Sequence, residues 1–166
     1  MSTVGTEAGP NIITIGASSI CSSSPPIVGL AIGRAQYSLG LINETGDFGV
    51  NLPSADQMHQ VDICGTHSGQ SVDKFSLSGF TAQPATQIRS PLIQECPVSM
   101  ECVLLQIVPL GNHEWVMGRI VAVHVDEELL DGKGNLDAAR ANPLLSFWGE
   151  YWRLGAKLAD WHYTRS

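Results

Sequence analysis

The apolar positions of this chain recur in short runs, and most of the runs have the composition of β-strands. Residues 11–20 are rich in Ile, Thr and Ser, residues 27–32 are continuously apolar, and residues 47–52 alternate before Pro53. Short runs with β-branched residues, bounded by Gly, Pro or Ser, are typical of strands. We therefore predict a strand over each of these ranges. Residues 3–9 contain two glycines and a glutamate, so we expect a turn there and a shortened first strand.

The second half of the chain contains the clearest hairpin signal. Residues 98–108 and 114–125 alternate in part and are rich in β-branched side chains, and residues 109–113 between them include Pro, Gly and Asn. This arrangement predicts two antiparallel strands joined by a short loop. Residues 75–97 are interrupted by prolines and show no strong period, so we predict an irregular segment there.

Three shorter segments carry helix signals. Residues 37–45 place apolar side chains at helical spacing and are followed by Gly46, a typical C-terminal cap. The serine that opens residues 54–63 is a typical N-terminal cap for a second helix. Residues 137–141 are predicted to form a short helix after a tight turn at residues 131–135.

Many short strands with a few short helices favour a mainly β fold, of class β or α+β. We predict a small β-barrel rather than a βαβ sandwich. A chain of 166 residues is long enough for one domain with its own core. We therefore expect residues 1–166 to form a single domain.

Composition and charge narrow the classes of function. Hydrophobic residues make up 43% of the chain and charged residues 15%, which is typical of a compact folded domain. The net charge of −7 argues against a nucleic acid or an anionic membrane as partner, because both select basic surfaces. No apolar run has the length of a membrane span, and the first residues resemble no secretory signal. We expect a cytoplasmic protein whose four scattered cysteines are reduced.

Residues 64–75, Cys-Gly-Thr-His-Ser-Gly-Gln-Ser-Val-Asp-Lys-Phe, have the composition of a phosphate-binding loop. Their two glycines let a ligand approach the main chain closely. Hydroxyl groups such as that of Ser68, free amides and the charge of Lys74 are suited to hold a phosphate. The alternative interpretation is a solvated loop in which Lys74 pairs only with Asp73.

Other chemistries have weaker support. His59, Cys64 and His67 are close in sequence, but their spacing matches no zinc-binding pattern, and His59 is expected on an exposed helix face. The chain contains no Gly-x-Ser-x-Gly elbow, no Gly-x-Gly-x-x-Gly fingerprint and no Walker loop. We therefore assign neither a catalytic residue nor a metal site, and a phosphate would be held by scattered loop groups.

Several other side chains have two interpretations. His113 is either an exposed turn residue or a donor to an anion or to a ring edge that gains negative charge. His124, inside an apolar strand, is more typical of a structural histidine. Arg34 is either a surface residue or an anion contact together with Ser38 at a helix start. The aromatic side chains of residues 147–161 either pack in the core or cover a flat cofactor.

Short motifs form an ordered set over nearly the whole chain. They are Asn11-Ile12-Ile13-Thr14, Pro25-Pro26, Arg34, Tyr37-Ser38, Thr45-Gly46-Asp47-Phe48-Gly49-Val50-Asn51-Leu52-Pro53, Cys64-Gly65, Ser68-Gly69, Asp73-Lys74-Phe75, Pro91-Leu92-Ile93, Glu95-Cys96-Pro97, Gly111-Asn112-His113, Gly118, His124-Val125-Asp126, Tyr151 and Leu154-Gly155. The Val-Asn-Leu-Pro and Ser-Gly-x-x-x-Asp-Lys-Phe segments are the most specific. Together the motifs resemble the flavin reductase-like family of FMN-binding split barrels, and flavoredoxins in particular.

This resemblance implies that FMN binds noncovalently at the interface of a homodimer. The phosphate of FMN would contact Ser38 and Lys74, with Ser68 in the same loop as Lys74. Asn11 and Thr14 would lie near the isoalloxazine ring, where groups of the first strand address its polar edge. These residues are therefore expected to bind the cofactor.

The resemblance also implies flavin contacts from His113 and from the aromatic Phe147. Flavoredoxins can carry a large aromatic residue beside the ring, six residues after the asparagine, where this chain has Ala17. Ala17 would leave a roomier pocket or a differently held ring. It is therefore included among the expected cofactor-binding positions.

The implied chemistry is that of the cofactor, which accepts hydride at its N5 atom while the protein supplies position and electrostatics. We expect an NAD(P)H-dependent flavin reductase, with NAD(P)H as co-substrate and a flavin or redox protein as acceptor. The alternative is a flavoredoxin-type FMN electron carrier without its own NAD(P)H reductase activity. A third interpretation is a split barrel that has lost its ligand and serves only dimerisation.

Overall fold

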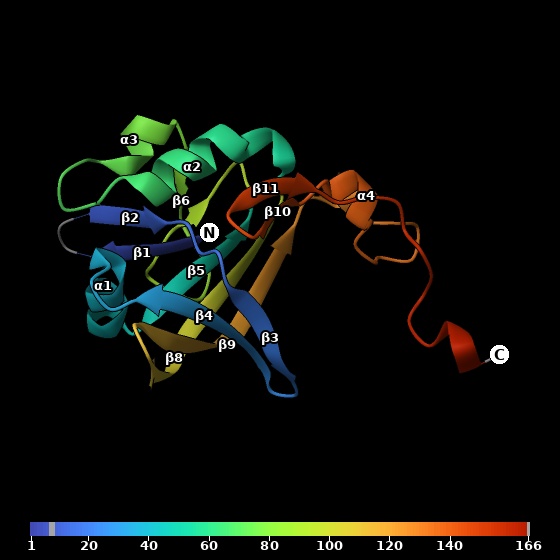
Figure 1. The fold of residues 1–166 in the computed structure, drawn as a ribbon, viewed down its shortest axis with the longest axis horizontal. Helices are drawn as coiled ribbons and strands as arrows, with labels where there is room; N and C mark the ends of the chain where they lie inside the picture. The colour runs from blue at the N-terminus through green and yellow to red at the C-terminus, as the bar shows by residue number, and fades with distance from the viewer. Residues whose placement is uncertain (7–8, 166) are drawn as a thin grey trace.

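The structure is a computed structural model that describes residues 1–6 and 9–165. At its centre is a seven-stranded antiparallel sheet with the strand order β2-β1-β5-β8-β9-β4-β3. The sheet curls on itself (Figure 1), but the described residues of its edge strands β2 and β3 do not pair with each other. The strands of this open barrel are β1 (Ser2–Thr6), β2 (Gly9–Ile13), β3 (Ser18–Ser23), β4 (Pro26–Gly33), β5 (Asp47–Leu52), β8 (Val98–Leu110) and β9 (His113–Val125).

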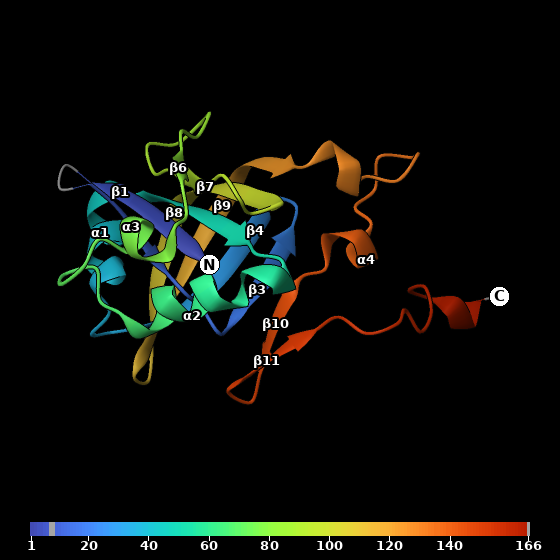
Figure 2. The same ribbon diagram turned by 90° about the horizontal axis from the view of Figure 1, so that it is seen from above.

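Short helices and two small sheets surround the barrel (Figures 1 and 2). The helices α2 and α3 lie on one side of β1 and β2, and α1 lies on the other side. The α-helices are α1 (Tyr37–Thr45), α2 (Met58–Thr66), α3 (Lys74–Ser78) and α4 (Ala138–Ala141), and the 3-10 helices are η1 (Ala55–Gln57), η2 (Glu127–Leu129) and η3 (Tyr163–Arg165). The two-stranded sheets pair β6 (Ala82–Gln83) with β7 (Leu92–Ile93), and β10 (Leu144–Phe147) with β11 (Glu150–Arg153).

The predicted boundaries of α1 and the predicted start of the next helix are confirmed, but α2 continues to Thr66, beyond the predicted end at residue 63. Gly46 ends α1 with a φ of 71°, and its N–H donates to the Ile42 carbonyl at 2.9 Å. A left-handed residue at this position favours glycine. At the next helix, the N–H of Ser54 donates to the side chain of Gln57 at 2.8 Å as part of a capping box. The turn η1 follows this cap and continues into α2.

The predicted hairpin and the last predicted helix are also confirmed. The strands β8 and β9 pair over their whole length and are longer than expected, because only Gly111 and Asn112 remain between them. Asp137 accepts hydrogen bonds from the N–H groups of Ala139 and Arg140 and so begins α4. In the predicted turn before it, the Asp131 carboxylate accepts from two main-chain N–H groups.

Three of the predicted segments are wrong. Residues 11–20 are not one strand, because β2 ends at Ile13 and β3 begins at Ser18. Residues 3–6 belong to β1 rather than to a turn, since main-chain pairing with β2 and β5 holds them extended; residues 7–8 of that prediction lie outside the described residues. The predicted irregular segment begins with α3, whose N-cap Asp73 accepts from the N–H groups of Phe75 and Ser76. That the first strand is shorter than is usual for this fold stays a prediction.

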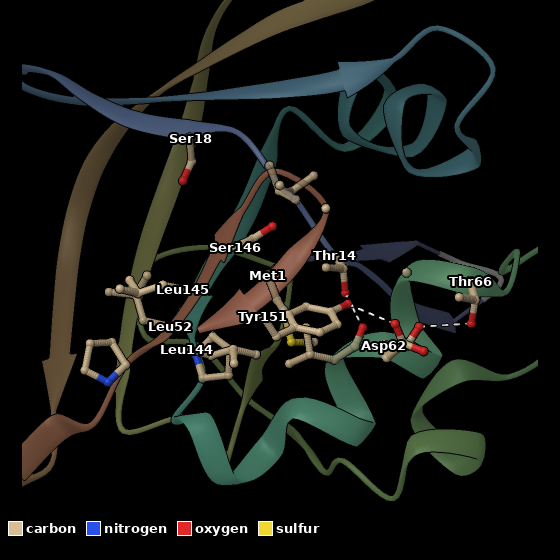
Figure 3. Close-up of a pocket in the computed structure, with 17 residues that line it drawn as sticks. Met1, Thr14, Ser18, Leu52, Asp62, Thr66, Leu144, Leu145, Ser146 and Tyr151 are labelled. Atoms are coloured by element: carbon tan, nitrogen blue, oxygen red, sulfur yellow. Dashed lines mark hydrogen bonds between the residues drawn. The ribbon is translucent and has the colours of Figure 1, made fainter. Parts of the chain in front are cut away.

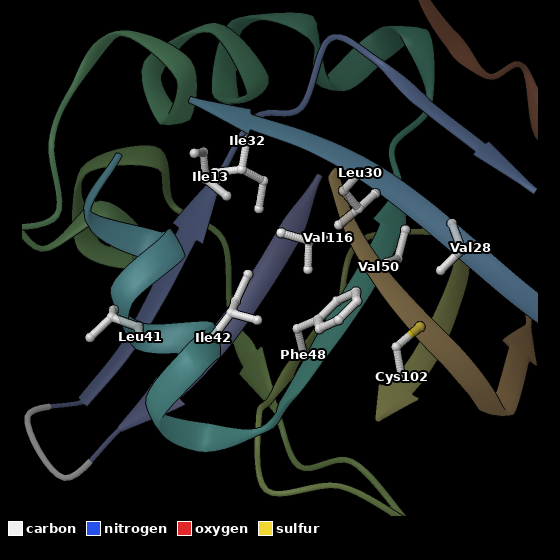
Figure 4. Close-up of a cluster of buried hydrophobic side chains, with 10 residues drawn as sticks. All are labelled: Ile13, Val28, Leu30, Ile32, Leu41, Ile42, Phe48, Val50, Cys102 and Val116. Carbon is white, nitrogen blue, oxygen red and sulfur yellow. The ribbon is translucent and has the colours of Figure 1, made fainter. Parts of the chain in front are cut away.

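Alternate residues of β2 face two separate apolar clusters. Ile13 belongs to the cluster inside the barrel, together with Leu41 and Ile42 of α1 (Figure 4). Ile12 belongs to the cluster that includes Val61 of α2 and Phe75 of α3. Since successive side chains of a strand point to opposite faces, β2 separates the environment of α1 from that of α2 and α3.

Among the described residues, no helix is long and apolar enough to cross a membrane.

Candidate functional site

A cavity of about 660 Å³ opens between the β2–β3 connection, α2 and the β10–β11 hairpin (Figure 3). Its size is within the range of about 300–1,000 Å³ that is typical of small-molecule sites. The lining contains one carboxylate, that of Asp62, and no Lys, Arg or His side chain, and the N-terminal ammonium of the lining residue Met1 donates to the Asn51 carbonyl at 2.7 Å. The cavity therefore suits an uncharged, largely apolar group with a few polar atoms.

The β2–β3 connection forms the first wall of the cavity. The Thr14 hydroxyl donates a 2.6 Å hydrogen bond to the Val61 carbonyl, and Gly65 lies so near that an added Cβ would be 3.3 Å from Thr14 Cβ. This contact fixes the connection against α2. The main-chain N–H groups of Ile15 and Gly16 lie between the two strands, and they donate to no other described group. They are available to acceptor atoms of a ligand.

The β10–β11 hairpin forms the opposite wall. The Tyr151 hydroxyl donates to Oδ1 of Asp62 at 3.0 Å, and both side chains line the cavity (Figure 3). Burial raises the pKa of Tyr151, and the hydrogen bond to Asp62 and its negative charge raise it further. At the other end of β11, Arg153 forms a 2.6 Å ion pair with Asp56. These two contacts hold the hairpin against the α2 layer.

Asn11 and Ser38, both predicted to bind the cofactor, are in direct contact. Asn11 Nδ2 donates to Ser38 Oγ at 2.7 Å, and both residues are buried. The loop after α2 packs on this pair, since a Cβ added to Gly69 would lie 2.0 Å from Asn11 Oδ1 and 3.3 Å from a ring carbon of Tyr37. The absence of a side chain at Gly69 is therefore required for the loop to pack there.

Lys74 lies on the other side of β2. Its ammonium group is buried and donates to the Cys64 carbonyl at 2.8 Å. Burial lowers the pKa of Lys74, and the nearby Cys64 opposes this effect. Ser38 is on α1 and Lys74 is on α3, so one phosphate that contacts both would have to lie at the edge of β2. Their joint contact with a phosphate stays a prediction.

The solvated-loop alternative for residues 64–75 describes part of that segment. Ser68 is exposed, and its carbonyl accepts from the N–H groups of Ser71 and Val72. Asp73 caps α3, and its hydrogen bonds with Ser76, first from the side chain and then from the main chain, lower its pKa. The predicted ion pair between Lys74 and Asp73 is absent from this described loop, since Lys74 points to Cys64 instead.

Of the remaining predicted residues, Ala17 is next to the cavity, and His113 and Phe147 are not part of its lining. Ala17 is exposed between two lining residues, and its carbonyl accepts from Ala31 at 3.0 Å. His113 is at the β8–β9 turn, where it pairs with Gly33 and contacts the Asn112 side chain at 2.7 Å. Phe147 is 63% exposed. Flavin contacts of His113 and Phe147 stay predictions.

The aromatic residues near the C-terminus do not pack in the core, so that interpretation is wrong. Trp148, Trp161 and Tyr163 are 88%, 90% and 71% exposed. His124 has the predicted structural role, since its Nε2 contacts the buried carboxylate of Glu101 at 2.7 Å. Arg34 forms an ion pair with Glu114 at 2.8 Å.

Sequence reasoning missed Asp62 as a cavity residue. Asp62 lies in an amphipathic helix, where a single carboxylate usually faces solvent, and its partner Tyr151 is 89 residues away in the sequence. His59 is exposed as predicted. No group of three or more His, Cys, Asp or Glu side chains suited to a metal ion occurs in the described part of the chain. All four cysteines are free.

Comparisons with known proteins define the class. The family model of the flavin reductase like domain matches residues 1–155, so the chain belongs to the flavin reductase-like family. A solved flavoredoxin of Desulfovibrio vulgaris (Miyazaki F) is 28% identical, with a TM-score of 0.92 over 99% of this chain and 90% of that chain. The mainly β split-barrel fold and the family expected from the motifs are thereby confirmed.

Two sequence relatives extend this similarity. A protein of unstated function from Archaeoglobus fulgidus is 31% identical over 128 residues, which cover 77% of this chain and 72% of that protein. An NADH:FMN oxidoreductase of Rhodococcus erythropolis is 25% identical over 151 residues, which cover 91% of this chain and 72% of that protein.

Proposed function

We propose that this protein is an FMN-binding oxidoreductase that holds the flavin ring in the cavity beside the β2–β3 connection. The observation that carries the proposal is the lining of this cavity. Its walls are mostly apolar, and the free N–H groups of Ile15 and Gly16 lie at one side. A flat heteroaromatic ring with polar atoms along one edge fits such a site.

In this proposal, different parts of the chain bind the ring and the phosphate of the cofactor. Thr14 and the adjacent main-chain groups would hold the ring, with Ala17 beside it. The phosphate, which a cavity lined by no Lys, Arg or His side chain does not suit, would bind toward Asn11, Ser38, Ser68 and Lys74. Thr14 is three positions after Asn11 along an extended chain, which is roughly 10 Å. The edge of β2 therefore offers a path from the ring to the phosphate.

Bound FMN would supply hydride and electron transfer. We propose that the electrons come from NADH or NADPH, and the similarity to a Rhodococcus NADH:FMN oxidoreductase supports this. The chain's part is to bind and orient the ring, and to shield it with the β10–β11 hairpin. A flavin or a redox protein would be the acceptor.

The test measures, by absorbance, the aerobic oxidation of NADH and of NADPH by the protein, with and without added FMN. The proposal predicts FMN-dependent oxidation of at least one nucleotide. A protein that binds FMN but oxidises neither nucleotide would instead be a flavoredoxin-type electron carrier, which the similarity to a solved flavoredoxin supports. A protein that does not bind FMN would contradict both the reductase and the electron-carrier proposals.

The partners and the location belong to the same proposal. We expect a homodimer in which FMN lies near the interface, because Phe147 and His113 of one chain do not line its own cavity. In this proposal a second copy supplies His113 and Phe147 to the flavin. The cytoplasmic location and the single-domain organisation also stay predictions.

A further inference from the structure

A second, smaller cavity of about 170 Å³ lies between residues 83–97 and the strands β8 and β9. Two of its lining residues, Ser99 and His124, pair directly across β8 and β9, so they share a face of the sheet. The next residue of β8, Met100, packs against the cluster inside the barrel, so this face points away from the barrel interior. Among the described residues, none lines both this cavity and the larger one. The smaller cavity is therefore separate from the candidate flavin site.

Acceptor side chains of the sheet hold residues 83–97 in place above this cavity. The carboxylate of Glu101, on β8, accepts hydrogen bonds from three consecutive main-chain N–H groups, those of residues 86–88, at 2.8, 2.6 and 3.1 Å. Asn51 Oδ1, on β5, accepts from the N–H group of Ile93 at 2.9 Å. Glu101 and Asn51 are both fully buried. These contacts fix one wall of the cavity without the help of a ligand.

Glu101 also fixes the orientation of His124 in the lining. His124 Nε2 lies 2.7 Å from Oε1 of Glu101. An ionised carboxylate can only accept, so Nε2 carries the hydrogen, and Nδ1 of the neutral imidazole is then an acceptor. The side chain of His124 is 40% exposed, and no described group forms a hydrogen bond with its Nδ1. The cavity therefore offers an oriented ring nitrogen to a ligand that can donate a hydrogen bond.

The charges of the lining favour a cation as the ligand. Asp126 is exposed, its N–H group donates to the Pro97 carbonyl at 3.1 Å, and its side chain forms no capping bond to η2. Burial raises the pKa of the Cys96 thiol to about 12, so this lining group stays neutral. No Lys or Arg is among the described residues that line the cavity. An anion would therefore meet the Asp126 carboxylate without a fixed cation to offset it, whereas a cation would be paired.

The size of the cavity limits the ligand to one ring. An apolar cavity of about 150 Å³ in an engineered protein holds benzene, and this cavity has a similar volume. Its lining is polar in part, and its apolar part is suited to the flat face of a ring. The apolar side chains are those of Pro84, Leu92, Ile93, Pro97 and Val125.

We propose that this cavity binds a small planar organic cation, with an amidinium or guanidinium group on an apolar body no larger than a single ring. The N–H groups of the cation would donate to the Asp126 carboxylate and to His124 Nδ1. Hydrogen bonds between a cation of this kind and a carboxylate are stronger than those between neutral groups. The site is separate from the proposed flavin site, and its occupation requires no flavin.

The test is a titration of the full-length protein, without FMN, with benzamidine, followed by NMR of the main-chain amides. Because no flavin is present, a failure of the protein to bind FMN does not affect the result. We expect saturable shifts at Ser99 and Val125 of this cavity, and none at Thr14 and Gly65 of the larger one. Benzamide, which is neutral and similar in shape, should bind more weakly, and benzoate should not bind here. Absence of saturable shifts at Ser99 and Val125, or equal binding of benzamide or benzoate, would overturn the proposal.

Two pairs of variants test the placement of the cation. Asp126→Asn should raise the dissociation constant of benzamidine about threefold to tenfold, whereas Glu128→Gln, which removes the same charge outside the lining, should not change it. Gln94→Trp places a bulky ring at the wall of the cavity and should abolish binding. Its control is Gln87→Trp, at an exposed position of the same segment that does not line the cavity. Equal affinity of wild type and Asp126→Asn, or equal losses in both members of either pair, would overturn the proposal.

Discussion

The Tyr151 hydroxyl and the Asp62 carboxylate are joined by a 3.0 Å hydrogen bond that connects β11 to α2 beside the cavity. The two residues are 89 positions apart in the sequence. Together with the Arg153–Asp56 ion pair, this contact holds the β10–β11 hairpin at the side of the cavity.

Replacing Tyr151→Phe removes this hydrogen bond and keeps the ring. Since a hydrogen bond to a partly exposed group contributes about 1 kcal/mol, we expect a loss of about 1 kcal/mol or less in the free energy of unfolding. The less restrained hairpin should weaken FMN binding about threefold to tenfold, measured by calorimetric titration. Tyr163→Phe, at an exposed position near the C-terminus, is the matched control. Equal affinity of Tyr151→Phe and wild type would show that the hairpin does not form a wall of the FMN site.

Gly69→Ala tests the packing of the loop on Asn11. An added Cβ would lie 2.0 Å from Asn11 Oδ1, so the loop or the Asn11–Ser38 pair must move. We expect a loss of about 1–3 kcal/mol in the free energy of unfolding, measured by denaturant titration, together with weaker FMN binding. Gly132→Ala is the control, because nothing lies within 4 Å of its added Cβ. A neutral Gly69→Ala would mean that the loop does not pack on Asn11 in this way.

Glu101 makes the stability of the fold depend on pH. Burial by itself raises the pKa of this fully buried carboxyl, but hydrogen bonds from Thr86, His124 and Gln87 outweigh burial and lower the pKa to about 2. A folded-state pKa below the ordinary value of 4.5 means that the contribution is present above about pH 4.5 and is lost as the pH falls toward 2. Its size is about 3 kcal/mol.

We therefore expect the free energy of unfolding to fall steeply between pH 4.5 and 2. Glu101→Gln should be less stable at pH 7 by about 2–4 kcal/mol. Its side-chain NH₂ group would face main-chain N–H groups whose hydrogen bonds the Glu101 carboxylate accepts. Its stability should also change less with pH in this window. Glu44→Gln, at an exposed position, is the control. A wild-type slope that persists in Glu101→Gln would assign the acid sensitivity to other carboxylates.

Lys74→Met separates a phosphate contact from a structural role. Methionine retains most of the buried stem of Lys74 and removes the ammonium group that donates to Cys64. If this ammonium also binds the phosphate, FMN affinity should fall at least tenfold, whereas the affinity for riboflavin, which has no phosphate, should stay the same. Lys133→Met, in an exposed turn, is the control. Parallel losses for both ligands would indicate only a structural role for Lys74.

Local signals predicted much of the fold and little of the site. Gly46 and Ser54 end and begin helices through contacts within a few residues, so the sequence alone predicts them. The break between β2 and β3 was missed because Thr14 is held there by Val61, which is 47 residues away. The role of Asp73 as the N-cap of α3 was not predicted, because its loop was interpreted as a phosphate site.

The resemblance to the family implies that Asn11, Ser38 and Thr14 bind the cofactor, which stays a prediction. The structure brings the first two into contact and places the third in the lining of the cavity. It did not identify the contact of Asp62 with Tyr151. That pair arises when a C-terminal hairpin packs on α2, which depends on tertiary packing and leaves no local pattern. The orientation of Lys74 toward Cys64 likewise follows from how α3 packs against α2.

The most direct test of the account is a titration of the protein with FMN, followed by flavin fluorescence, for the wild type and two hairpin variants. Ser146→Trp places a bulky ring into the cavity, whereas Glu150→Trp changes a residue of the same hairpin that does not line it. We expect saturable binding to the wild type and to Glu150→Trp, and at least tenfold weaker binding to Ser146→Trp. Absence of binding to the wild type, or equal affinity of all three proteins, would contradict the placement of FMN in this cavity.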